Sequence, residues 1–89
     1  DVIIPQAISP NEDGFNDVFE IQNLYDVHLN HQLKIYNRYG ECIFEGNNNK
    51  KWAGLSDKGK LIPVGTYFYV LHLNNENKEV FTGWVYCNY

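Results

Sequence analysis

Turn-forming residues interrupt this chain at short intervals, and this punctuation limits what the chain can fold into. Asn, Asp, Gly, Pro and Ser favour turns because they accept positive φ, fix φ or hydrogen-bond to nearby backbone. Clusters of these residues occur at positions 9–14, 37–40, 46–49, 57–59, 63–65 and 74–77. The segments between most of these clusters are short runs of strand-forming residues. This spacing predicts an all-β fold of the sandwich type.

The composition favours strands as well. Aromatic residues make up 16% of the chain, Met is absent, and Ala occurs only at positions 7 and 53, so strong helix formers are scarce. A hydrophobic content of 44% is enough for a folded core, and 89 residues suit one domain. We therefore expect a single domain over residues 1–89.

The expected strands follow from these runs. They cover residues 2–8, 17–22, 31–37, 41–45, 65–73 and 79–87, with a short extra strand near 51–52. The segment 24–30 has no clear period and is interpreted as a crossing loop or one helical turn. The fold expected is an immunoglobulin-like β-sandwich of about seven antiparallel strands.

One hairpin is marked by Arg38-Tyr39-Gly40. Gly40 suits the left-handed position that follows a type I turn. With a bulge there, Ile35 is expected to face Ile43, and Cys42 to point to the opposite face.

The alternation of the last strand places its side chains on two faces. Trp84 and Tyr86 share one face and are the best candidates for an exposed aromatic pair. Val85 and Cys87 lie on the other face, which is expected to be the core. An inward Cys87 and an outward Cys42 argue against a disulfide, but a register change of one residue reverses this, so a bridge and two free thiols both stay open.

The charge distribution excludes several classes of partner. The net charge is −4 and there is no basic stripe, so neither nucleic acid nor an anionic membrane surface is an expected partner. No apolar run is long enough to span a bilayer, so direct membrane insertion is not expected. Ser occurs only at positions 9 and 56, and neither has an evident acid–base pair. The chain is therefore expected to be non-catalytic.

The first loop has the spacing of a calcium-binding loop. Counted from Ser9, Gly14 falls at the sharp-turn position and Glu20 at the twelfth, with Ser in place of the usual first Asp. A hydrogen-bonded turn without metal is the favoured interpretation, so no cofactor is expected, and a bound calcium ion is the alternative. The candidate calcium ligands are Asn11, Asp13, Phe15 and Asp17.

Five sequence pieces in order resemble a known family. They are Ser9-Pro10-Asn11-x-Asp13-Gly14-x-Asn16-Asp17, Leu33-x-Ile35-Tyr36-Asn37-Arg38-Tyr39-Gly40, Trp52-x-Gly54, Pro63-x-Gly65-Thr66-Tyr67-Phe68-Tyr69 and Gly83-Trp84-Val85. Together they resemble the C-terminal sorting domain of gliding motility-associated surface proteins of Bacteroidetes. That domain is the type B signal of the type IX secretion system.

The resemblance implies an immunoglobulin-like domain that follows N-terminal passenger domains in one exported polypeptide. The route implied leads through the periplasm and across the outer membrane to the cell surface or the medium. The partner implied is the outer-membrane secretion machinery. A calcium-stabilised adhesion or carbohydrate-binding module is the alternative function.

The resemblance also selects candidate recognition residues. Turn formation alone explains many of them, whereas no turn requires Arg38, which is expected either to pair with a loop carboxylate or to meet a partner. The candidates are Asn11, Asp13, Gly14, Asn16 and Asp17 in the first loop, and Asn37, Arg38 and Gly40 in the hairpin.

Overall fold

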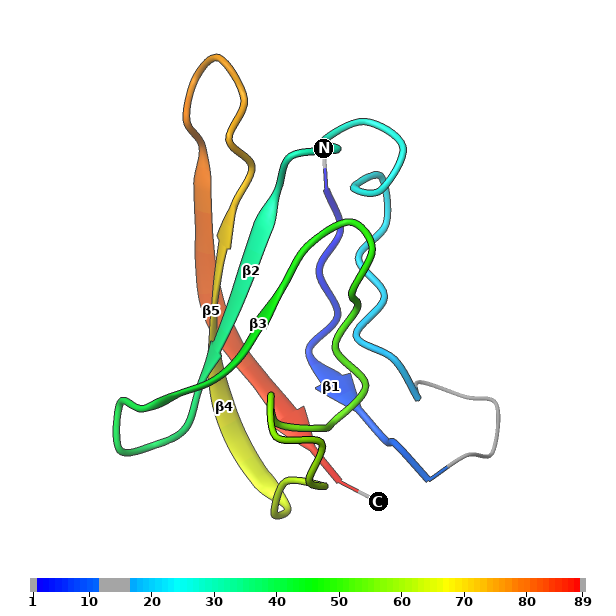
Figure 1. Ribbon diagram of the computed structural model, residues 1–89, viewed down its shortest axis with the longest axis vertical. Coiled ribbons are helices and arrows are strands. Elements are labelled where there is room, and N and C mark those ends of the chain that lie inside the picture. The colour runs from blue at the N-terminus through cyan, green and yellow to red at the C-terminus, as the bar shows by residue number, and fades with distance from the viewer. Residues whose placement is uncertain (1, 12–16, 89) are drawn as a thin grey trace.

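The computed structural model describes residues 2–11 and 17–88, and its strands form one mixed sheet (Figure 1). The order across the sheet is β1-β5-β4-β2-β3. The described residues form no helix, which confirms the expected all-β class. They therefore include no helix that could cross a membrane. The strands are β1 (Ala7–Ile8), β2 (Gln32–Tyr36), β3 (Cys42–Gly46), β4 (Gly65–His72) and β5 (Val80–Cys87).

Four of the expected strands form nearly as predicted, and the N-terminal ones do not. The strand expected over residues 2–8 is reduced to β1, because Pro5 lacks the N–H that a ladder requires. β1 also pairs parallel to β5, whereas only antiparallel pairs were expected.

The second sheet of the expected sandwich is replaced by irregular chain. Residues 17–22 and 51–52 do not form strands and are joined by the bond from Phe19 N to Trp52 O, 2.8 Å long. A single antiparallel bridge joins Ile3 to Gln22. The expectation of about seven antiparallel strands is therefore not confirmed, since the described residues form five strands in one sheet.

Segment 24–30 was expected to be a crossing loop or one helical turn, and it forms a turn. Its backbone makes one bond of helical spacing, from His28 N to Leu24 O at 2.8 Å, and no helix follows. The turn leads the chain from the irregular layer back into β2.

The hairpin of β2 and β3 forms as predicted, but its register differs by one residue. Ile35 pairs with Phe44 and Tyr36 pairs with Cys42, so Ile43 is the extra residue of a bulge. Ile35 therefore does not face Ile43. The bulge turns Phe44 into the core, and it leaves Cys42 exposed as expected.

The core lies between one face of the sheet and the irregular layer, which form the two sides of the molecule in Figure 1. Trp52 is fully buried at its centre. Its ring centroid lies 5.8 Å from that of Phe19, 6.4 Å from Phe44 and 6.1 Å from Tyr67. Its indole Nε1 donates to the carbonyl of Leu55 at 3.1 Å. One tryptophan thus joins the irregular layer to strands β3 and β4.

Candidate functional site

The outer face of the sheet, opposite the core, carries a row of aromatic side chains. Tyr36, Phe68 and Trp84 are paired across β2, β4 and β5. The rings of Phe68 and Trp84 meet edge to face with centroids 5.0 Å apart. Trp84 is 61% exposed and Tyr86 is 44% exposed, which confirms the expected exposed aromatic pair.

The turn between β2 and β3 is held by the side chain of Asn37. Its Oδ1 accepts hydrogen bonds from the backbone N–H groups of Tyr39, at 2.9 Å, and Glu41, at 3.0 Å. Its Nδ2 donates to Oε1 of Glu41 at 3.0 Å. Gly40 has a φ of +82°, which an L-residue adopts only with strain. Asn37 and Gly40 therefore shape the turn, and this places Arg38 at its tip.

Arg38 is oriented by the next residue in the chain. Its Nη2 donates to the hydroxyl of Tyr39 at 2.8 Å, and its guanidinium carbon lies 5.0 Å from the centre of the Tyr39 ring. Ion pairs between described residues join Lys50 to Asp57 and Lys51 to Glu20, and none includes Arg38. Within residues 2–11 and 17–88, Arg38 thus has a stacking partner but no carboxylate.

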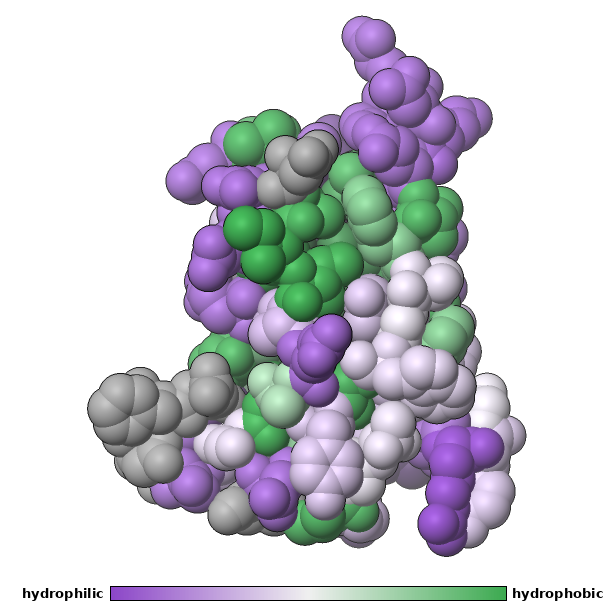
Figure 2. All heavy atoms as spheres, turned by 180° about the vertical axis from the view of Figure 1, so that it is seen from behind, coloured by the Kyte–Doolittle hydropathy of each residue, from purple (hydrophilic) through white to green (hydrophobic). Residues whose placement is uncertain are grey.

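The hairpin turn and the aromatic row meet in one shallow depression. Its lining is almost wholly apolar apart from the turn. In Figure 2 the turn projects as a hydrophilic protrusion beside a paler part of the sheet side. We call this surface the aromatic–arginine face. It is lined by Tyr36, Asn37, Arg38, Gly40, Phe68, Val70 and Trp84.

Only some of these residues were candidates from the sequence. Asn37, Arg38 and Gly40 were candidates for recognition, and Trp84 was a candidate for exposure. The structure brings these two signals to one place. Tyr36 and Phe68 were missed, although strand alternation alone places Phe68 on the face of β4 that does not carry Tyr67.

The described flanks of the first loop, residues 9–11 and 17–22, lie across the molecule from the turn between β2 and β3 (Figure 1). Asp13, Gly14, Phe15 and Asn16 fall outside the described residues. Asn11 and Asp17 are the recognition candidates on the described flanks. The surface lined by Asn37, Arg38 and Gly40 includes none of the described flanks of this loop.

The flanks of this loop show how two sequence pieces meet. The Pro10 ring lies over Gly54, where an added Cβ would come within 2.5 Å of it. Gly54 also has a φ of +79°. Glu20, the twelfth position of the calcium pattern, forms an ion pair with Lys51, whose Nζ lies 3.1 Å from both carboxylate oxygens. No cluster of three or more His, Cys, Asp or Glu side chains that suits a metal occurs among residues 2–11 and 17–88.

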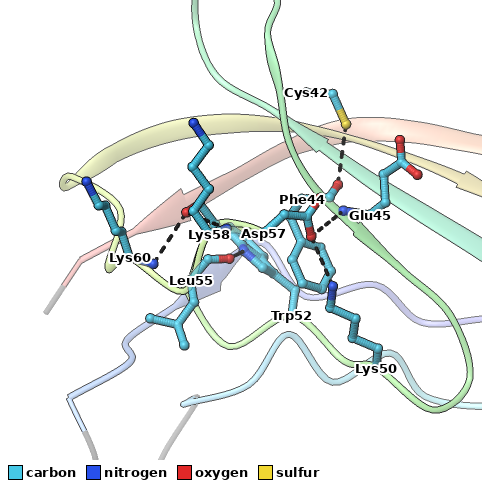
Figure 3. Close-up of polar contacts among 10 residues, drawn as sticks. Cys42, Phe44, Glu45, Lys50, Trp52, Leu55, Asp57, Lys58 and Lys60 are labelled. Carbon is cyan, nitrogen blue, oxygen red and sulfur yellow. Dashed lines mark hydrogen bonds and ion pairs between the residues drawn. The ribbon is translucent and has the colours of Figure 1, made fainter.

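The outer edge of β3 is covered by Asp57 (Figure 3). Its backbone N–H donates to the carbonyl of Ile43 at 2.9 Å, and its Oδ1 accepts from Glu45 N at 3.4 Å. Lys50 Nζ lies 3.0 Å from the same oxygen. Asp57 thus occupies backbone groups to which another strand would otherwise bind.

No disulfide joins the two cysteines. Cys42 is exposed and Cys87 is buried, as the alternation of their strands predicted. The sequence had left a bridge and two thiols as alternatives, and the structure favours the thiols because the two side chains lie on opposite faces of the sheet.

Buried titratable groups serve the fold. Burial raises the pKa of Tyr67, whose hydroxyl donates to the carbonyl of Pro63 at 2.7 Å. Burial likewise raises the pKa of Tyr25 and Tyr69. His31 is buried, with Nδ1 2.9 Å from the carbonyl of His28. The Tyr25 hydroxyl also donates within the fold, to the carbonyl of Phe19 at 3.3 Å.

Comparison with known proteins matches the chain to a family model. A family model described as CHU_C Type IX secretion signal domain matches residues 2–87, which is nearly the whole chain. No curated protein matches.

Proposed function

The chain belongs to the CHU_C type IX secretion signal domain family, and from this premise we propose that it is the C-terminal sorting signal of a longer exported protein. In this role the folded domain docks with the secretion machinery at the outer membrane. The passenger precedes the domain in the same polypeptide and reaches the cell surface or the medium through the periplasm. The domain itself is not an enzyme.

The observation that carries this proposal is the family match over residues 2–87. A match of this extent includes every strand of the sheet, so recognition by a folded surface is favoured over recognition of a short linear tail. The hairpin supports such a surface, because Asn37 and Gly40 determine the turn that presents Arg38.

A secretion assay tests the proposal. Residues 1–89 are fused behind a signal peptide and a fluorescent passenger, in a host with an intact type IX system and in a matched strain without it. We expect passenger on the surface or in the medium only when the system is intact. A stable, folded fusion that stays in the periplasm of both strains would contradict the proposal.

A further inference from the structure

The aromatic–arginine face exposes apolar surface that the core does not use. Val85 and Cys87 are fully buried on the inner face of β5, whereas Trp84 points outward and is 61% exposed. Its ring contact is with Phe68, which lies on the same outer face. The exposed part of Trp84 therefore contributes nothing to the core and is available to a partner.

Arg38 adds one positive charge at the end of this apolar surface. A guanidinium has five N–H donors, and one bond is made to the Tyr39 hydroxyl. The hairpin carboxylate of Glu41 is bound by Asn37 Nδ2. Because Arg38 forms no ion pair with the described residues, its remaining donors are directed to solvent or to a partner.

One further basic residue, Lys34, belongs to the outer face of β2. It lies opposite Glu45 in the strand register, so an opposite charge neighbours it, although the two side chains form no ion pair. Arg38, unlike Lys34, lines the depression itself, so it is the positive charge that a partner seated there would meet. A carboxylate suits this position, because guanidinium binds carboxylate with two parallel hydrogen bonds.

The size of the face indicates a short ligand. The lining residues come from β2, β4, β5 and one turn, and neighbouring strands are about 4.8 Å apart. Such a surface covers a few hundred Å² at most, against about 800 Å² per partner in a stable protein interface. A second copy of the chain would need more area than this face provides.

We propose that the aromatic–arginine face binds a short protein segment in which a carboxylate side chain lies beside a large apolar side chain. The carboxylate pairs with Arg38, and the apolar side chain packs on Trp84 and Phe68. This inference rests on the proposed function, since the segment would belong to a component of the secretion machinery.

A peptide library displayed on phage tests the inference directly. The library is selected on the unmodified chain, on Arg38→Glu and on Trp84→Thr. Lys58→Glu is the control for the charge change at an exposed turn, and Val27→Thr is the control for loss of an exposed apolar side chain. A far-ultraviolet circular dichroism spectrum that matches the unmodified chain, at a temperature below the melting transition of every variant, shows that the fold is intact.

We expect enriched peptides to carry Asp or Glu next to an aromatic or large aliphatic residue. Their affinity should fall about tenfold or more in Arg38→Glu and in Trp84→Thr, and stay unchanged in both controls. Three results overturn the inference: no enriched peptide, enrichment without acidic residues, or binding that survives either variant. Glycan binding that needs Trp84 and ignores Arg38 would also overturn it, because it assigns the face to a sugar.

Secretion of the same variants separates this inference from the proposed function. If the unmodified fusion is exported and both face variants are exported equally well, the sorting function stands and the inference fails. If the unmodified fusion is not exported, the proposed function fails, and the peptide selection still decides what the face binds.

Discussion

The two tryptophans allow one chemical change to be made on opposite faces of the structure. Trp52 is completely buried and contacts three other aromatic rings, so Trp52→Ala removes packing at the centre of the core. Loss of a buried tryptophan costs about 3–5 kcal/mol. The carbonyl of Leu55 also loses its donor. Because small domains are stable by only about 5–15 kcal/mol, this variant should be close to unfolding at physiological temperature.

Trp84→Ala should cost much less. Trp84 is 61% exposed, so less than half of its surface is buried. With about 200 Å² for a tryptophan, the buried part is worth at most about 2 kcal/mol at 25 cal/mol per Å². Part of this is the edge-to-face contact with Phe68. We expect a loss of about 1–2 kcal/mol and a fully folded variant.

Thermal unfolding followed by far-ultraviolet circular dichroism measures the difference. For a domain of this size 1 kcal/mol shifts the melting temperature by about 4–8 °C. Trp52→Ala should therefore lower it by roughly 12–40 °C, and Trp84→Ala by roughly 4–16 °C. Equal shifts, or a larger shift for Trp84→Ala, would refute the assignment of the two faces.

Four further predictions concern the turn, the sheet edge, the thiols and pH. Gly40→Ala should lower the free energy of unfolding by about 1–2 kcal/mol in a urea titration. An added Cβ has room at this position, but the Gly40 φ of +82° strains any L-residue. An unchanged urea midpoint would contradict this. Asp57→Ala exposes the edge of β3 and should cause self-association in analytical ultracentrifugation, where a purely monomeric variant would count against the edge argument. A thiol reagent should modify Cys42 alone in the native protein and both Cys42 and Cys87 in denaturant, and two reactive native thiols would be inconsistent with the fold. Burial raises the pKa of Tyr67 in the folded state, so its contribution to stability is complete below pH ~10 and is lost as the pH rises through the folded pKa. Unfolding midpoints at several alkaline pH values measure this, and Tyr67→Phe should weaken the dependence.

Local patterns in the sequence were sufficient for the four long strands. Their alternation also predicted which side of β5 is buried, since Val85 and Cys87 are inside and Trp84 is outside. The hairpin turn was predictable because Asn37 and Gly40 act on backbone groups within four residues. Even residues 17–22 keep their alternation, as Phe19 and Ile21 are buried without a strand.

The errors occurred where pairing depends on distant residues. The bulge at Ile43 shifts the register of β3, and the sequence around the turn does not distinguish it from a bulge at Gly40. Residues 17–22 were expected to form a strand, but their extended backbone meets residue 52 through one hydrogen bond instead of a ladder. Whether an extended segment becomes a strand depends on its neighbour, which the segment itself does not contain.

The candidate site shows the same division. The sequence by itself determined that Arg38 stands at a turn and that Trp84 faces away from the core, because both follow from residues close in the chain. Only the tertiary structure decided that these two residues, separated by two strands in sequence, line one surface with Tyr36 and Phe68. The pairing of β2 with β4 and of β4 with β5 brings them together, and that pairing arises from burial of the opposite face of the sheet.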